Sequence, residues 1–118
     1  MRIGIDASFI SFPGVGRYIS CLIKGFQSLN LDDQFFMYGL GQDRLQLEQL
    51  VNHNIFLKEL NFKPLSIFSQ IEWNRILIRD DIEIFHAAHY VHPLWLPKKI
   101  KLVITLHDAV YLDFLLPE

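Results

Sequence analysis

Short apolar runs alternate with amphipathic stretches along the whole chain. Runs rich in β-branched and aromatic residues occur at positions 3–7, 34–38, 55–57, 83–86 and 101–106. These lengths and compositions predict buried β-strands. Between them, apolar residues at three- and four-residue spacing predict helices over about 15–29, from 43 to about 51, and over 69–79. Strands that alternate with helices indicate parallel pairing with right-handed crossovers.

This alternation predicts an α/β fold. We expect a Rossmann-like three-layer sandwich with a mainly parallel sheet and strand order 3-2-1-4-5. In such sheets, ligands bind outside the carboxyl ends of the strands, where the strand order reverses. The Gly14 loop, the segment 86–92 and His107-Asp108 each follow a predicted strand. We therefore expect all three to open onto one crevice.

Polar residues that can cap a helix occur at the starts of two predicted helices. Ser69 and Glu72 have the spacing of a capping box, although Ile67 and Phe68 leave room for an earlier start. Asp43 is a candidate cap for the helix that follows the second strand.

The loop after the first strand contains Gly14-Val15-Gly16-Arg17, directly before the first helix. Glycines let a ligand approach the backbone, and the first N–H groups of a helix attract anions. A phosphate- or sugar-phosphate-binding loop is one interpretation, and a tight strand-to-helix connection is the other. A dinucleotide fingerprint has a third glycine where this chain has Ile19, and the long connection 8–12 also argues against NAD.

Composition excludes several classes of protein. The chain has 118 residues, 51% of them apolar, which is enough for the core of one domain. A net charge of −2 gives no support for a nucleic-acid partner, and the basic run at 98–101 is interpreted as a solvated approach to a strand, with membrane contact as the alternative. The single cysteine, Cys21, excludes a disulfide framework. Without a signal peptide or long apolar segment, a cytoplasmic location is expected.

Four of the five histidines follow Ile84. His86, His89 and His92 suggest a metal site only if they lie on a helix, which Pro93 argues against, so no metal is expected. We interpret His86 as a hydrogen-bonded histidine at the end of a strand, and His89 with Tyr90 as the residues that contact a ligand. His107 and Asp108 end the fifth strand, where an imidazole and a carboxylate can bind substrate hydroxyls; a purely structural role for His107 is the alternative.

Four motifs together resemble the N-terminal half of family 4 retaining glycosyltransferases, particularly the bacterial mannosyltransferase-like members. They are the opening Met-Arg-Ile-Gly-Ile-Asp-Ala, the Gly-Val-Gly-Arg-Tyr loop at 14–18, Ile-Phe-His-Ala-Ala-His-Tyr at 84–90 with Pro93, and Val-Ile-Thr-Leu-His-Asp at 103–108. They occur in the same order and at fitting intervals over essentially the whole chain.

The resemblance implies a two-domain GT-B enzyme that moves a sugar from a nucleotide-sugar donor to a glycan or lipid-linked acceptor with retention of configuration, without a metal or other cofactor. Mannose is the candidate sugar, and polysaccharide biosynthesis is the implied context. Carried over by position, the segment 14–17, with Gly14, Val15, Gly16 and Arg17, lies against the donor phosphates and sugar. His107, with Asp108, contacts the transferred sugar, and His89 and Tyr90 face the acceptor.

The resemblance also implies a second domain that holds most of the nucleotide site. Residues 1–118 then correspond to an incomplete N-terminal, acceptor-side domain, and we expect the chain alone to have little or no transferase activity. A free-standing Rossmann-like module that binds a nucleotide or phosphate is one alternative. A self-associating assembly module that uses the aromatic loop near Tyr90 and Trp95 is another. Peripheral contact with the inner face of a membrane stays open.

Overall fold

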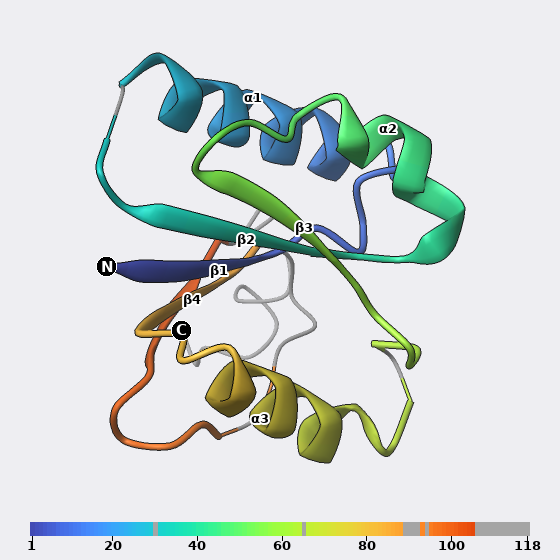
Figure 1. Cartoon of the computed structure of the whole chain (residues 1–118). Coiled ribbons are helices and arrows are strands. Elements are labelled where there is room, and N and C mark those ends of the chain that lie inside the picture. The colour runs from blue at the N-terminus through green and yellow to red at the C-terminus, as the bar shows by residue number, and fades with distance from the viewer. Residues whose placement is uncertain (30, 65, 89–92, 94, 106–118) are drawn as a thin grey trace, which may run out of the picture.

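The fold is a parallel α/β sandwich, described here from a computed structural model. The structure describes residues 1–29, 31–64, 66–88, 93 and 95–105. Five strands form one sheet in the order β3-β2-β1-β4-β5, and every neighbouring pair is parallel (Figure 1). The strands are β1 (Arg2–Asp6), β2 (Gln34–Gly39), β3 (Ile55–Glu59), β4 (Ile84–Ala87) and β5 (Lys101–Ile104). The predicted Rossmann-like fold and its strand order are confirmed.

Helices cover both faces of the sheet. Helix α1 (Val15–Ser28) and the short α2 (Arg44–Glu48) lie on one face, and α3 (Ser69–Arg79) lies on the other (Figure 1). A 3₁₀ turn, η1 (Gly41–Asp43), leads into α2. Because each helix returns the chain to the amino edge of the sheet, every strand ends at the same edge as β1. The carboxyl ends of the strands therefore lie together.

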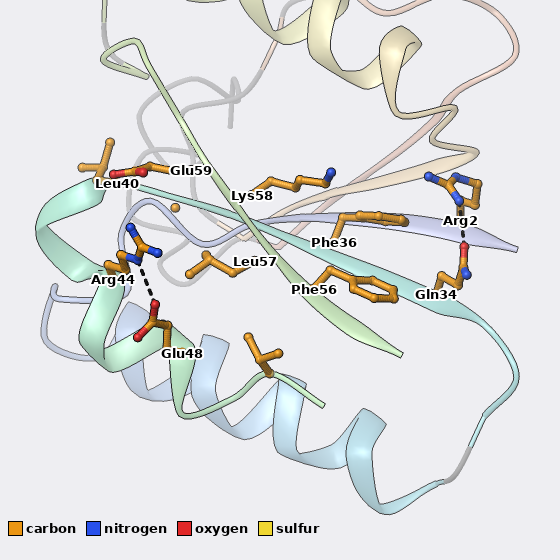
Figure 2. Close-up of a pocket in the computed structure, with 12 residues that line it drawn as sticks. Arg2, Gln34, Phe36, Leu40, Arg44, Glu48, Phe56, Leu57, Lys58 and Glu59 are labelled. Atoms are coloured by element: carbon orange, nitrogen blue, oxygen red, sulfur yellow. Dashed lines mark hydrogen bonds and ion pairs between the residues drawn. The ribbon is translucent and has the colours of Figure 1, made fainter. Parts of the chain in front are cut away.

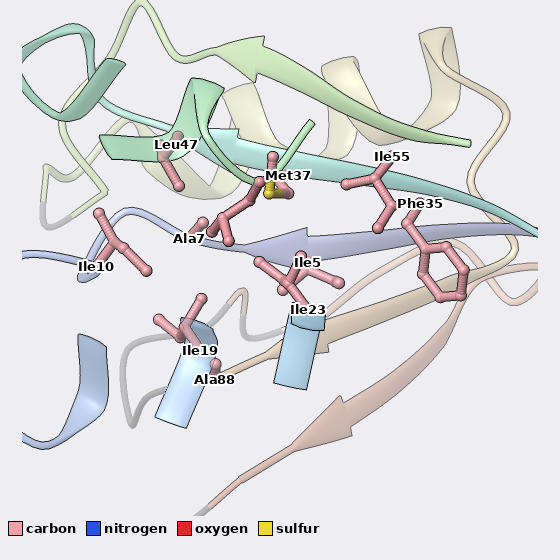
Figure 3. Packing of buried hydrophobic residues seen from close by; sticks show 11 residues of the cluster. Ile5, Ala7, Ile10, Ile19, Ile23, Phe35, Met37, Leu47, Ile55 and Ala88 are labelled. Atoms are coloured by element: carbon pink, nitrogen blue, oxygen red, sulfur yellow. The ribbon is translucent and has the colours of Figure 1, made fainter. Parts of the chain in front are cut away.

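The core beneath α1 consists of aliphatic side chains from alternate strand positions. Figure 3 shows Ile5 and Met37 from neighbouring strands packed against Ile19 and Ile23 of α1, and all four are buried. The spacing of Ile19 and Ile23 is one helical turn, and the spacing along a strand is two residues, so both patterns point to the same layer. This packing fixes the start of α1 beside the end of β1.

The core beneath α3 is more aromatic. Trp73 of α3 packs edge-to-face against Tyr38, with ring centroids 5.7 Å apart, and lies 4.9 Å from the ring of Phe85. Gly4 of β1 allows this arrangement, because a Cβ atom there would lie 3.0 Å from the Tyr38 ring and 3.2 Å from the Phe85 ring. The Tyr38 hydroxyl donates to Asp80 Oδ2 at 2.7 Å, which ties β2 to the end of α3.

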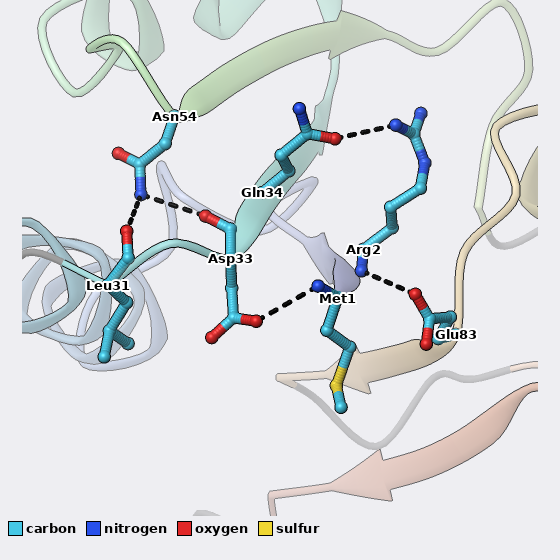
Figure 4. A network of polar contacts seen from close by, with 7 residues as sticks. All are labelled: Met1, Arg2, Leu31, Asp33, Gln34, Asn54 and Glu83. Atoms are coloured by element: carbon cyan, nitrogen blue, oxygen red, sulfur yellow. Dashed lines mark hydrogen bonds and ion pairs between the residues drawn. The ribbon is translucent and has the colours of Figure 1, made fainter.

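Polar contacts hold the amino edge of the sheet together (Figure 4). The N-terminal ammonium of Met1 lies 3.2 Å from Asp33 Oδ1, and the side-chain amide of Asn54 donates to the backbone carbonyls of Leu31 and Asp33 at 3.0 Å each. The Arg2 guanidinium donates to Gln34 Oε1 at 2.7 Å. These bonds join the starts of β1, β2 and β3 at the amino edge of the sheet.

The two predicted helix caps are not formed. Phe68 occupies the N-cap of α3, and neither Ser69 nor any other side chain caps that end, so the capping-box prediction is wrong. Asp43 does precede α2, but its side chain makes no capping bond and its buried Oδ2 has no partner within the described residues. Burial raises the pKa of the Asp43 carboxyl.

Two elements are shorter than predicted. Helix α2 ends at Glu48, earlier than the predicted 51, and β5 ends at Ile104 rather than 106.

Candidate functional site

The glycine loop between β1 and α1 is a tight, hydrogen-bonded turn. Gly14 has φ 80° and ψ −64°, and the Val15 N–H donates to the Pro13 carbonyl at 2.9 Å. These dihedral angles and this bond across one residue define a classic γ-turn, a strained conformation with positive φ that favours glycine. Gly14 is exposed, and a Cβ atom built on it would have no neighbour within 4 Å. The turn therefore presents bare backbone to open space.

Gly16 has a packing role. A Cβ atom at this position would lie 1.9 Å from the backbone oxygen of Ile10, so only glycine lets the first turn of α1 rest on the preceding loop. The Gly16 N–H donates to the Phe12 carbonyl at 2.8 Å, which leaves it unavailable to an anion in this conformation. The γ-turn at Gly14 and the close packing at Gly16 thus each favour glycine, whether or not the loop binds a ligand.

The remaining donor of the first helical turn belongs to Arg17. Its N–H makes no hydrogen bond to another part of the chain that the structure describes, and its side chain is exposed. An unpaired N–H at a helix start carries part of the positive end of the helix dipole. Of the predicted segment 14–17, the backbone at Gly14 and Arg17 is therefore open to a ligand, while the N–H groups of Val15 and Gly16 are already bonded.

Three side chains from three elements meet at the carboxyl edge of the sheet. The Thr105 hydroxyl, directly after β5, is hydrogen-bonded to the Tyr18 hydroxyl of α1 at 3.0 Å and to Nε2 of His86 in β4 at 2.6 Å. The Tyr18 and His86 rings also contact each other edge-to-face, with centroids 6.3 Å apart. We call Tyr18, Thr105 and His86 the switch-point cluster, because β1 and β4 flank the place where the strand order reverses.

Asp6 ends β1 beneath this loop. Its carboxylate oxygen Oδ1 accepts the Ser8 N–H at 3.0 Å and the Ser8 hydroxyl at 2.5 Å. Burial raises the pKa of Asp6 from 3.8 to about 6, while the two bonds from Ser8 lower it. Buried carboxylates with raised pKa values are concentrated at functional sites, although structural ones occur as well. Asp6 is thus a titratable group close to neutral pH at the carboxyl edge.

The structure describes only part of the predicted site. His89, Tyr90, His107 and Asp108 lie outside the described residues. His86 is a hydrogen-bonded histidine near the end of a strand, as predicted. The sequence interpretation did not identify Thr105 and Asp6 as site residues. The signal available for Thr105 was its position two residues before His107, at the end of the same apolar run.

No group of three or more histidine, cysteine, aspartate or glutamate side chains that could hold a metal ion is found among the described residues. None of the helices in the described ranges combines the length and the apolar character that crossing a bilayer requires. Cys21 is a free thiol on the exposed side of α1. Lys98, Lys99 and Lys101 are exposed before and at the start of β5.

A pocket of about 560 Å³ lies at the carboxyl ends of β1, β2 and β3. We call it the aromatic pocket; its apolar and charged walls are Phe9, Phe12, Leu40, Leu60, Phe62, Lys63 and Pro64. The pocket and the glycine loop lie at the same edge of the sheet. Residues 8–12 follow β1, contribute Phe9 and Phe12 to the pocket, and lead into the glycine loop. No sequence pattern predicted it, since its walls come from three separate segments, which follow β1, β2 and β3.

A second pocket, of about 780 Å³, follows the outer strand β3 (Figure 2). Phe36 and Phe56 stack there with centroids 5.3 Å apart, and the Arg2 guanidinium lies 4.5 Å from the Phe36 ring. The Lys58 ammonium lies 5.8 Å from the same ring. The long cationic side chains thus cover aromatic rings near the sheet edge. We assign this pocket a structural role.

Comparison with known proteins gives no identification. No family model, curated protein or solved structure matches the chain. The function is therefore argued from the geometry of the carboxyl edge.

Proposed function

We propose that this chain is the N-terminal, acceptor-side domain of a GT-B retaining glycosyltransferase related to family 4. The complete enzyme transfers a sugar, with mannose as the first candidate, from a nucleotide-sugar donor to a glycan or lipid-linked acceptor. A donor-binding domain completes the site, so this chain alone has little or no transferase activity. Gly14 to Arg17 contact the donor phosphates and sugar, His107 and Asp108 the transferred sugar, and His89 and Tyr90 the acceptor.

The observation that carries this proposal is the position of the switch-point cluster beside the γ-turn at Gly14. A tyrosine hydroxyl, a threonine hydroxyl and an imidazole converge next to exposed backbone at the place where open α/β sheets bind ligands. Hydroxyl and imidazole groups both donate and accept hydrogen bonds, which suits a ligand rich in hydroxyl groups. Exposed backbone at a helix start suits a phosphate.

The chemistry of transfer fits these groups. Departure of a nucleoside diphosphate builds negative charge on the leaving phosphate, and a free N–H at the positive end of α1 can stabilise that charge. Hydrogen bonds from the strand ends to the sugar would orient its anomeric carbon toward the acceptor. In this proposal Thr105 is a positioning residue: it holds Tyr18 and His86 in place and begins the segment that leads to His107.

The test is nucleotide release from sugar nucleotides by the gene product that carries this chain together with a donor-binding domain. Thr105→Val removes the shared hydroxyl and should lower kcat/KM by about tenfold, the cost of one lost hydrogen bond near the reacting groups. Thr105→Ser keeps the hydroxyl and should retain most of the activity. His107→Ala should lower kcat more than it weakens donor binding.

Two results would contradict the proposal. Equal activity of Thr105→Val, Thr105→Ser and the parent protein would remove the cluster from the site. Tight calorimetric binding of a dinucleotide or sugar nucleotide by residues 1–118 alone would instead favour a free-standing binding module, because a GT-B enzyme divides its donor site between two domains. Far-ultraviolet circular dichroism of each variant separates loss of folding from loss of function.

A further inference from the structure

We propose that the aromatic pocket binds the hydrocarbon chain of a membrane lipid that carries an anionic headgroup. The pocket and the exposed apolar side chains beside it would form one membrane-facing surface at the carboxyl edge of β1–β3. This inference does not depend on the proposed transferase function, since it follows from a different set of residues.

The walls of the pocket suit a hydrocarbon chain. Phe9 and Phe12 pack edge-to-face with centroids 5.0 Å apart, and Phe62 packs against the buried ring of Trp73 at 5.3 Å. Leu60 and Phe9 are buried and form a fixed apolar floor. A volume of about 560 Å³ lies within the range of small-ligand sites. Among the described residues that line the pocket, Lys63 is the only charged one, so most of an occupant's contacts would be apolar.

Large apolar side chains lie exposed at the pocket and in the segment that follows its wall at Lys63 and Pro64. Ile67 is 86% exposed and Phe68 is 64% exposed, and Ile71 and Phe12 are also exposed. The Ser66 N–H donates to the Lys63 carbonyl at 3.0 Å, and the Ser69 N–H donates to the Ser66 carbonyl at 3.1 Å. The first of these bonds ties the backbone directly before Ile67 and Phe68 to the pocket wall at Lys63. Exposed groups of this kind favour insertion into the interface of a membrane.

The charge at the pocket favours an anionic headgroup. Lys63 is exposed, and its ammonium has no ion-pair partner among the described residues. The two arginines of α3, by contrast, have ion-pair partners. Arg75 Nη1 lies 3.8 Å from Glu72 Oε1, and Arg79 Nε lies 3.2 Å from Asp80 Oδ1. A free lysine beside exposed apolar side chains attracts anionic lipids more than zwitterionic ones. The occupant is therefore a lipid with both a chain and a negative headgroup.

Co-sedimentation with vesicles tests the surface. The chain should bind vesicles of equal parts phosphatidylcholine and phosphatidylglycerol, and bind phosphatidylcholine vesicles much more weakly. Lys63→Glu should weaken binding to the mixed vesicles by about tenfold, since it reverses one charge near the surface. Phe68→Ser should weaken it by a similar factor, because an inserted aromatic ring is lost. The matched control is Leu45→Ser, which removes an apolar side chain of α2 that is 81% exposed.

Fluorescence tests whether a chain enters the pocket. In a Trp95→Phe background, Trp73 is the only tryptophan, and it contacts Phe62 of the pocket wall. Lipids brominated on the acyl chain should quench Trp73. Gln42→Phe places a bulky side chain at the pocket and should reduce the quenching by more than half, while Gln46→Phe on exposed α2 should leave it unchanged.

Several outcomes would overturn the proposal. Equal binding to both kinds of vesicle, no vesicle binding, or equal losses in Phe68→Ser and Leu45→Ser would each do so. Quenching of Trp73 that Gln42→Phe does not change would exclude the pocket as the site of the chain. A dimer that Phe68→Ser dissociates, without vesicle binding, would assign the surface to a second copy of the chain. Thermal unfolding of each variant verifies that it is folded.

Discussion

Replacing Asp6 by asparagine should stabilise the protein at neutral pH and remove part of the pH dependence of its stability. Asp6 is 2% exposed at the end of β1, and both of its described hydrogen bonds come from Ser8. Burial raises its pKa to about 6, because the ionised form loses more hydration than the Ser8 bonds replace. At neutral pH the folded protein therefore holds a buried carboxylate whose ionisation is less favourable than it is in the unfolded chain.

The sign follows from the two pKa values. The folded state binds the Asp6 proton more tightly than the unfolded state, whose carboxyl has an ordinary pKa near 3.8. The stabilising contribution is therefore complete below about pH 4, is lost as the pH rises to about 6, and is absent above that. A rise of roughly two pH units in pKa corresponds to about 3 kcal/mol of unfolding free energy.

Asparagine keeps an oxygen acceptor for Ser8 and carries no charge at any pH. The Asp6→Asn variant should therefore be more stable than the parent protein by up to about 3 kcal/mol near neutral pH, and close to it in stability near pH 4. The buried amide N–H₂ reduces this gain if it finds no acceptor. Urea unfolding monitored by tryptophan fluorescence, at several pH values, measures the difference.

The control is Asp32→Asn, which removes an exposed carboxylate before β2. It should change the free energy of unfolding little, because the Asp32 carboxylate is exposed and not buried. A stability difference between Asp6→Asn and the parent protein that stays constant from acid to neutral pH would refute the reasoning. So would a loss of stability in Asp6→Asn that grows as the pH rises.

Two further substitutions test the packing around the site and the core. Gly16→Ala should destabilise the protein by about 2–4 kcal/mol, because its Cβ would meet the rigid backbone oxygen of Ile10 at 1.9 Å. The control Gly25→Ala, on an open part of α1, should stabilise the protein by up to about 1 kcal/mol. Chemical denaturation compares the two variants, and equal changes in unfolding free energy would contradict the close packing at Gly16. Tyr38→Phe should cost about 1–3 kcal/mol, since the buried Asp80 carboxylate loses its 2.7 Å hydrogen bond from the phenol. An unchanged midpoint of thermal unfolding for Tyr38→Phe would show that this bond contributes nothing.

Local pattern was enough to predict the elements. The alternation of short β-branched runs with helical spacing gave the strands and helices in the right order, because a buried strand and an amphipathic helix differ in period within a few residues. The helix starts were less predictable. Ser69 has the right spacing for a cap, yet the helix begins with Phe68 at the N-cap and no side-chain bond, since turns in the preceding loop fix the chain there.

The sequence by itself therefore determined the α/β class, the parallel sheet and the position of the glycine loop before α1. It left open why the loop needs its glycines, and only the tertiary structure assigned Gly14 to a γ-turn and Gly16 to contact with Ile10. The switch-point cluster also depended on tertiary structure. Tyr18 and Thr105 are 87 residues apart in the chain, and they meet because parallel strands bring their carboxyl ends to one edge of the sheet. Periodicity carries no information on which side chains share that edge at hydrogen-bonding distance.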